Sequence, residues 1–251
     1  MKTISIYNIK GGVSKTTTAI NLSSELAAQG NRVLLIDNAP QANATTGIGL
    51  HAGETHSILE VMTKKVEIQD AITETDIKNL DLLPSHIRYI TGDSKIGAHA
   101  IRLLRALEKI KDNYDFCLID NDPAINILST NSLVASDYVI IPIRIDKYAL
   151  DGFGYLLNTI ESIQEDYNPN LKILGVLLTQ YEKNTTVMSS LKTDLEEKLG
   201  DMVFNTVIRK NIKLVESPFY GQPVNVYDRS SYGAKDYLAL TEEVLQRVQE
   251  K

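Results

Sequence analysis

Seven short apolar runs predict the strands of a buried sheet. They are rich in Val, Ile and Leu and do not alternate with polar residues, which is typical of strands covered on both faces. The runs occupy residues 3–7, 32–36, 80–83, 116–119, 138–143, 173–178 and 203–208. Stretches with a helical spacing of apolar residues separate most of them, at 16–29, 97–111, 125–135, 150–165, 185–199 and 234–249.

The alternation of strands and helices predicts an α/β fold. Repeated strand–helix–strand units build three layers, with a mostly parallel twisted sheet between helices on both faces. A chain of 251 residues with 43% apolar residues and no linker-like segment suits one domain over residues 1–251. In such a sheet the loops after the strands meet at one edge, where ligands bind.

The segment between the first strand and the first helix is typical of a phosphate-binding loop. It consists of Lys10, Gly11, Gly12, Val13, Ser14, Lys15, Thr16 and Thr17. Its glycines let backbone N–H groups turn toward an anion, and the N-terminus of the following helix adds the positive end of its dipole. We expect Lys15 to reach the outer phosphates of a nucleotide and the Thr16 hydroxyl to bind Mg²⁺.

Two other strand-like runs end in an acidic residue. Asp37 follows the run at 32–36 and Asp120 follows the run at 116–119. A hard cation prefers carboxylate oxygens, so Asp120 is a candidate Mg²⁺ ligand. The alternative is that Asp120 only caps the next helix.

Charge and cysteine content narrow the functional classes. The net charge of −6 does not favour a general nucleic-acid binder, so DNA binding would need a local basic surface. The single cysteine, Cys117, lies in an apolar run and is expected in the core. The chain has no run of about 18 apolar residues that could span a membrane, and it opens on a strand with no signal-peptide pattern. We therefore expect a cytoplasmic protein without membrane attachment.

The motifs together resemble the ParA/MinD class of ATPases. Residues 10–16 resemble its deviant Walker A loop, K-G-G-x-x-K-[ST]. Residues 33–47 resemble the switch segment of the ParA/Soj partition ATPases, and residues 207–218 and 221–228 resemble the C-terminal signatures of that family. The resemblance implies a P-loop fold, ATP and Mg²⁺ as cofactors, and ATP hydrolysis in which Asp37 takes part.

The resemblance also implies partners. Lys10 is expected to reach the nucleotide of the partner subunit in an ATP-dependent homodimer, and Thr179, Arg209 and Asn211 are expected near the adenine. Non-specific double-stranded DNA is expected to bind basic residues near the C-terminal motifs: Arg209, Lys210, Lys213, Arg229 and Lys235. A ParB-type centromere-binding protein would stimulate hydrolysis, so that a nucleoid-associated protein segregates plasmid or chromosome copies.

Three residues depart from the family pattern. Ala39 replaces an acid that is associated with orienting the attacking water, so we expect impaired hydrolysis. Ala39 is either an engineered change that traps the ATP dimer, which the intact neighbouring motifs favour, or the natural residue of a slow paralogue. Ser14 replaces a glycine; its hydroxyl either donates to a phosphate oxygen or crowds Lys10 of the partner subunit. Asp122 is an extra acid, which we expect to cap the helix at 125–135, with water positioning as the alternative.

The main alternative is a MinD-like regulator that cycles on and off a membrane. That role needs a basic amphipathic helix at the C-terminus, whereas residues 240–251 are acidic and are expected to pack on the domain. A metabolic P-loop enzyme is a further alternative, for which the sequence shows no substrate pocket.

Overall fold

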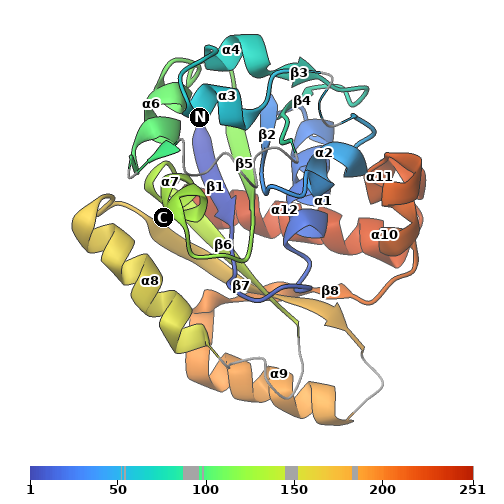
Figure 1. Cartoon of the computed structure of the whole chain (residues 1–251). Coiled ribbons are helices and arrows are strands. Elements are labelled where there is room, and N and C mark those ends of the chain that lie inside the picture. Colours follow the sequence, from blue (N-terminus) through green and yellow to red (C-terminus); the bar gives the residue numbers. More distant parts are fainter. Residues whose placement is uncertain are drawn as a thin grey trace.

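An eight-stranded sheet forms the centre of the computed structural model (Figure 1). The structure describes residues 1–51, 53, 55–86, 96–97, 99–144, 152–182 and 186–250. The strands are β1 (Lys2–Ile6), β2 (Val33–Asn38), β3 (Thr73–Glu74), β4 (Leu80–Leu83), β5 (Phe116–Asn121), β6 (Tyr138–Arg144), β7 (Lys172–Tyr181) and β8 (Val203–Arg209). Their order in the sheet is β3-β4-β2-β5-β1-β6-β7-β8.

The sheet confirms the prediction of a mostly parallel arrangement. Each of the seven predicted apolar runs forms a strand, and these seven strands pair in parallel. The eighth strand, β3, was not predicted; it has two residues and pairs antiparallel with β4 at one edge. A strand this short is below the length at which a periodic pattern can be read.

Helices cover both faces of the sheet (Figure 1). They are α1 (Lys15–Ala28), α2 (Asn43–Gly47), α3 (Ile58–Met62), α4 (Ile68–Ala71), α6 (Arg102–Glu108), α7 (Ile127–Val134), α8 (Phe153–Asp166), α9 (Thr186–Leu199), α10 (Lys213–Glu216), α11 (Val224–Tyr227) and α12 (Tyr232–Glu250), with 3₁₀ turns η2 (Gly200–Met202) and η3 (Ser217–Tyr220). Each of the six predicted helices has a counterpart among the described residues, although α6 and α7 begin later than predicted. Residues 98, 150–151 and 185 of the predicted ranges lie outside the described residues.

Side-chain contacts explain where two of these helices lie. Asn131 of α7 accepts hydrogen bonds from the backbone N–H groups of Arg102 and Leu103, which fixes the start of α6. The C-terminal helix α12 packs on the sheet and on α1, and it buries Tyr237, Leu240 and Val244. The prediction of a packed C-terminal helix is therefore confirmed.

The segment from α10 to α11 is fastened beside α1 and α2 (Figure 1). Asn21 of α1 accepts a hydrogen bond of 2.7 Å from the Val224 backbone N–H. Gly221 adopts a φ of +62°, and a Cβ added there would lie 2.5 Å from the Gly49 Cα. Only glycine allows this approach of two backbones. The late basic motifs are thereby brought to the helix that follows the phosphate loop.

Candidate functional site

The predicted phosphate loop connects β1 to α1 in a conformation that few residue types adopt. Gly12 has a φ of +70° and Ser14 a φ of +69°, both in the left-handed region. Ser14 also precedes the first residue of α1, and its carbonyl accepts the Thr18 N–H at 2.9 Å. The loop therefore presents backbone N–H groups at the N-terminus of a 14-residue helix, which is a favourable place for an anion.

Lys15 is buried at the base of this loop. Its Nζ atom donates a hydrogen bond of 2.8 Å to the Lys10 carbonyl, which folds the loop back over the lysine. Burial lowers the pKa of Lys15, and the nearby carboxylates of Asp120 and Asp122 partly oppose this shift. An ammonium has three donors, so this bond leaves capacity for an anionic ligand.

Asp37 and Asp120 form a pair of adjacent buried carboxyl groups. They are register partners on β2 and β5, and neither is exposed. Asp37 accepts hydrogen bonds from the backbone N–H and the hydroxyl of Thr45, both at 2.8 Å, and from the Ala39 N–H at 3.2 Å. Within the described part of the chain, neither carboxyl oxygen of Asp120 has a hydrogen-bond partner of normal geometry.

The electrostatics of the pair follow from these contacts. Burial raises the pKa of Asp37, and the hydrogen bonds from Thr45 oppose the shift. Burial and the charge of Asp37 raise the pKa of Asp120 further, although Thr16 and Lys15 lie near enough to oppose part of that shift. A buried carboxylate without a partner is unfavourable unless a proton or a cation neutralises it. Asp120 therefore fits the predicted role of a metal ligand.

A cavity of about 420 Å³ joins the three predicted motifs at the edge of the sheet. Its lining comes from the phosphate loop, from the segment after β2 and from the segment after β5: Gly11, Gly12, Ser14, Lys15, Thr16, Thr17, Ala39, Gln41, Asn43, Asn121, Asp122 and Pro123, together with Gln180 from β7. The structure thus places the predicted Ala39 beside the predicted phosphate loop. Gln180 follows Thr179 in the segment expected near the adenine, and it was not itself predicted to lie beside the phosphate loop.

The predicted capping role of Asp122 is wrong. The N-cap of α7 is Asn126, whose side chain accepts hydrogen bonds from the N–H groups of Leu128 and Ser129. The helix begins later than predicted, because Pro123 and the residues after it form an irregular turn. Asp122 instead lines the cavity and stays available for water positioning.

The three residues predicted near the adenine make contacts within the chain. Thr179 is fully buried, and its hydroxyl contacts the carbonyl oxygens of Val13 at 3.1 Å and Ile143 at 3.3 Å, so its side chain braces the phosphate loop. Arg209 is held by Asp236, and Asn211 accepts the Lys213 N–H. Their contact with a nucleotide base stays a prediction.

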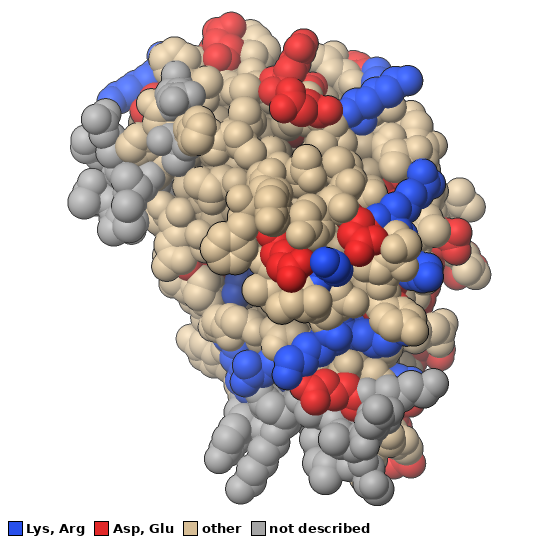
Figure 2. All heavy atoms as spheres, turned by 90° about the vertical axis from the view of Figure 1, so that its right-hand side faces the viewer, with Lys and Arg blue, Asp and Glu red and all other residues tan. Residues whose placement is uncertain are grey.

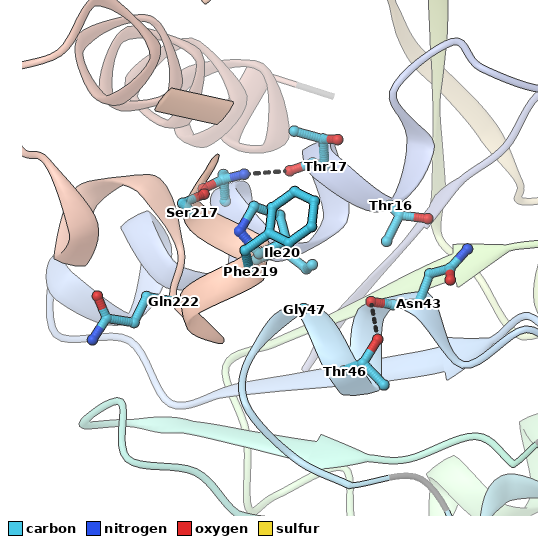
Figure 3. Close-up of a pocket in the computed structure, with 11 residues that line it drawn as sticks. Thr16, Thr17, Ile20, Asn43, Thr46, Gly47, Ser217, Phe219 and Gln222 are labelled. Carbon is cyan, nitrogen blue, oxygen red and sulfur yellow. Dashed lines mark hydrogen bonds between the residues drawn. The ribbon is translucent and has the colours of Figure 1, made fainter. Parts of the chain in front are cut away.

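A second cavity of about 420 Å³ shares Thr16, Thr17 and Asn43 with the first (Figure 3). It lies between α1, α2 and η3, and Ile20, Gly47 and Pro218 give it an apolar lining. The labelled side chain of Phe219 stands at this cavity, and the residue is 86% exposed. The C-terminal segment is therefore close to the predicted Mg²⁺ ligand Thr16.

The predicted DNA-binding residues gather on the side of the molecule that carries α10 and α11. Figure 2 shows Lys and Arg side chains in a band across this face, with Asp and Glu side chains between them. Arg209 pairs with Asp236, Lys210 with Glu182 at 2.7 Å and Lys213 with Glu216 at 2.9 Å. Arg229 and Lys235 are exposed.

Exposed apolar side chains accompany this band, and the sequence analysis did not predict them. They are Ile212, Val215, Phe219, Tyr220, Val226 and Tyr232. The guanidinium of Arg209 lies 4.2 Å from the centre of the Tyr232 ring, which orders the two side chains together. Among the described residues no helix is long and apolar enough to cross a membrane.

The sheet order, the loop and the acid pair define a P-loop nucleotide-binding protein of the α/β class. The family model described as "AAA domain" matches residues 1–173. The chain is 40% identical to the sporulation initiation inhibitor protein Soj of Bacillus subtilis over 247 residues, which covers 97% of this chain and 98% of Soj. It is 37% identical to the chromosome partitioning protein ParA of Caulobacter vibrioides over 257 residues, which covers 100% of this chain and 96% of ParA.

A solved structure has the same fold over nearly the whole chain. It is cobyrinic acid a,c-diamide synthase of Mycobacterium smegmatis with a bound ATP analogue and magnesium, at 30% identity and a TM-score of 0.87, covering 99% of this chain and 96% of that one. From these similarities, the chain belongs to the ParA/Soj family of chromosome-partitioning ATPases. The resemblance and the predicted fold class are confirmed.

The buried acid pair predicts how stability depends on pH. Because both pKa values are raised in the folded state, the folded protein keeps protons that the unfolded chain releases above about pH 4. The free energy of unfolding of the metal-free protein should therefore fall as the pH rises above that range. Asp120→Asn removes the group with the larger shift and should make the fall shallower. Urea unfolding in the presence of a chelator between about pH 5 and about pH 8 measures this; equal slopes in the two proteins would contradict the assignment.

Proposed function

We propose that this chain is an ATP-dependent partition ATPase whose ATP-bound homodimer binds DNA without sequence preference. The observation that carries the proposal is the fully buried carboxyl group of Asp120, which lies beside Asp37 at the strand end next to the phosphate loop and has no hydrogen-bond partner of normal geometry among the described residues. Such a carboxyl group needs a proton or a cation, and the phosphates of a nucleotide held by the phosphate loop would bind the same cation.

The residues of the cavity take distinct roles in binding Mg²⁺ and ATP. Backbone N–H groups of residues 11–17 and the Lys15 ammonium bind the phosphates, while the Thr16 hydroxyl and Asp120 hold Mg²⁺. Mg²⁺ held by these groups would supply positive charge that offsets the charge of the phosphate oxygens. Asp37 keeps Thr45 and the start of the switch segment in place through its three hydrogen bonds.

Lys10 makes dimerisation depend on nucleotide, because its side chain reaches the nucleotide bound to the partner subunit. It stands at the entrance of the loop, where its backbone N–H donates to the Asn8 side chain and its carbonyl accepts from Lys15 Nζ. A lysine side chain in this place stabilises phosphate charge in the partner subunit's site, as an arginine finger does. Nucleotide binding then drives dimerisation.

DNA binding would use the basic band of both subunits, which consists in each chain of Arg209, Lys210, Lys213, Arg229 and Lys235. One chain with a net charge of −6 does not attract DNA as a whole, whereas two bands on one face of a dimer give a local positive surface. A ParB-type centromere-binding partner then stimulates hydrolysis and releases the dimer, so that DNA copies separate on the nucleoid. Ala39 brings a methyl group to the cavity where an acid would orient water, so hydrolysis is slow.

Lys10→Ala should separate nucleotide binding from dimerisation. The substitution keeps the backbone contacts of residue 10, so the protein should still bind ATP but remain monomeric. Light scattering with and without ATP measures the mass, with Lys109→Ala on the distant α6 side as the control that should dimerise. A dimer of ATP-loaded Lys10→Ala would exclude the role in the partner's site.

Lys210→Glu and Lys213→Glu should abolish DNA binding and leave the ATP dimer intact. Lys109→Glu is the matched control, because Lys109 is also exposed and paired with a glutamate, Glu67. If n phosphates are contacted, the logarithm of affinity should fall with the logarithm of salt concentration at a slope of about −0.9n. Unchanged affinity in both test variants would show that the DNA surface lies elsewhere.

Ala39→Asp should raise the rate of ATP hydrolysis by about 10²-fold or more, because it restores a group that positions the attacking water. The increase should be largest with DNA and the ParB-type partner present. Asp122, which lines the same cavity, is the competing acid. If Ala39→Asp changes nothing while Asp122→Asn abolishes the basal rate, Asp122 positions the water and Ala39 is natural. No effect of either substitution would contradict this account of hydrolysis.

A further inference from the structure

We propose that Gln180 is a positioning residue that holds the phosphate loop in its anion-binding conformation, with Thr179 and Ser14 as its partners. Gln180 stands at the end of β7, two strands away from β1, and its side chain lines the nucleotide cavity. This role rests on the proposed binding of ATP. Gln180 lies outside the phosphate-loop motif.

Three consecutive loop residues are held from the end of β7. The Gln180 side-chain N–H₂ donates to the Gly12 carbonyl at 2.9 Å and to the Ser14 hydroxyl at 3.1 Å. The Thr179 hydroxyl contacts the Val13 carbonyl at 3.1 Å. Both amide protons of Gln180 are thereby used, which leaves none to donate to a nucleotide base.

These bonds set the direction of the N–H groups that face an anion. A trans peptide unit is planar, so a carbonyl and the N–H of the next residue point in opposite directions. Holding the Gly12 carbonyl therefore orients the Val13 N–H, and holding the Val13 carbonyl orients the Ser14 N–H. Lys15 does the same for the Gly11 N–H when it binds the Lys10 carbonyl.

The backbone is strained at both residues of the Gln180–Ser14 hydrogen bond, and such strain needs stabilising contacts. Ser14 has a φ of +69° and Gln180 a φ of +53°, a region that is unfavourable for residues with a Cβ. Strained residues persist where surrounding contacts over-determine them, and they cluster at binding sites. Here the side chain of one strained residue is bonded to the side chain of the other. Serine in place of the family's glycine at 14 thus supplies an acceptor that glycine lacks.

The test compares ATP with inorganic tripolyphosphate as ligands. Gln180→Met keeps the length of the side chain and removes its donors, and it should weaken both ligands by the same factor, about three- to tenfold. A loss of affinity for ATP alone would show that Gln180 contacts the base and would contradict the proposed role. If the wild-type protein binds both ligands and Gln180→Met binds them with the same affinities, the role is wrong. Wild-type protein that binds neither ligand would overturn the proposed function as well.

A double-mutant cycle tests the partnership with Ser14. Ser14→Ala should weaken tripolyphosphate binding in the wild-type background and have a smaller effect in Gln180→Met, because the shared hydrogen bond is already lost. Equal factors in both backgrounds would contradict the partnership. Gln164→Met is the matched control, since Gln164 donates to the Leu171 carbonyl at 2.6 Å far from the cavity. It should lower the melting temperature and leave both ligand affinities unchanged.

Discussion

Two carboxyl groups buried side by side are the constraint on which this site depends. Asp37 and Asp120 end adjacent strands, and water reaches neither of them. Two negative charges at this spacing in a medium of low dielectric repel each other strongly, so at least one group needs a proton or a cation. Asp37 accepts hydrogen bonds from Thr45 and Ala39, whereas the described residues offer Asp120 no hydrogen bond of normal geometry. The fold thus leaves the charge of Asp120 to be neutralised by a proton or a cation, and Asp120 lies beside the phosphate loop.

The residues around the acid pair favour a metal ion that binds together with phosphate. Directly after the acids, Asn38 and Asn121 continue the same register as a hydrogen-bonded amide pair, which adds no charge, and Asn121 lines the cavity. In front of them, Lys15 and the loop offer positive charge and N–H groups that attract phosphate but do not reach the acids with hydrogen bonds of normal geometry. Metal and phosphate therefore satisfy the site together. The basic segment from α10 to α11 is fastened to α1 and α2, and its residues Ser217, Pro218 and Phe219 line a cavity that also contains Thr16.

Local sequence patterns predicted the seven main strands and the residues of the phosphate loop, because buried strands and glycine-rich turns are specified by neighbours in the chain. They did not predict β3 or helices of four or five residues such as α2, α10 and α11, which are too short to show a period. Asp122 was misjudged because either Asp or Asn can cap a helix, and only the turn after Pro123 decides which does. Gln180 meets Gly12 across 168 residues of sequence, a contact that no local pattern encodes.

The proton content of the acid pair tests the account most directly. If Asp120 holds a proton until a cation arrives, binding of Mg²⁺–ATP near pH 7 should release protons from the protein. Calorimetry in buffers of different ionisation enthalpy counts them, and the difference between the wild-type protein and Asp120→Asn removes protons released by the nucleotide itself. The account predicts a release in the wild-type protein that Asp120→Asn lacks. Equal release in both proteins would mean that Asp120 is already ionised without the metal, and the central constraint would be wrong.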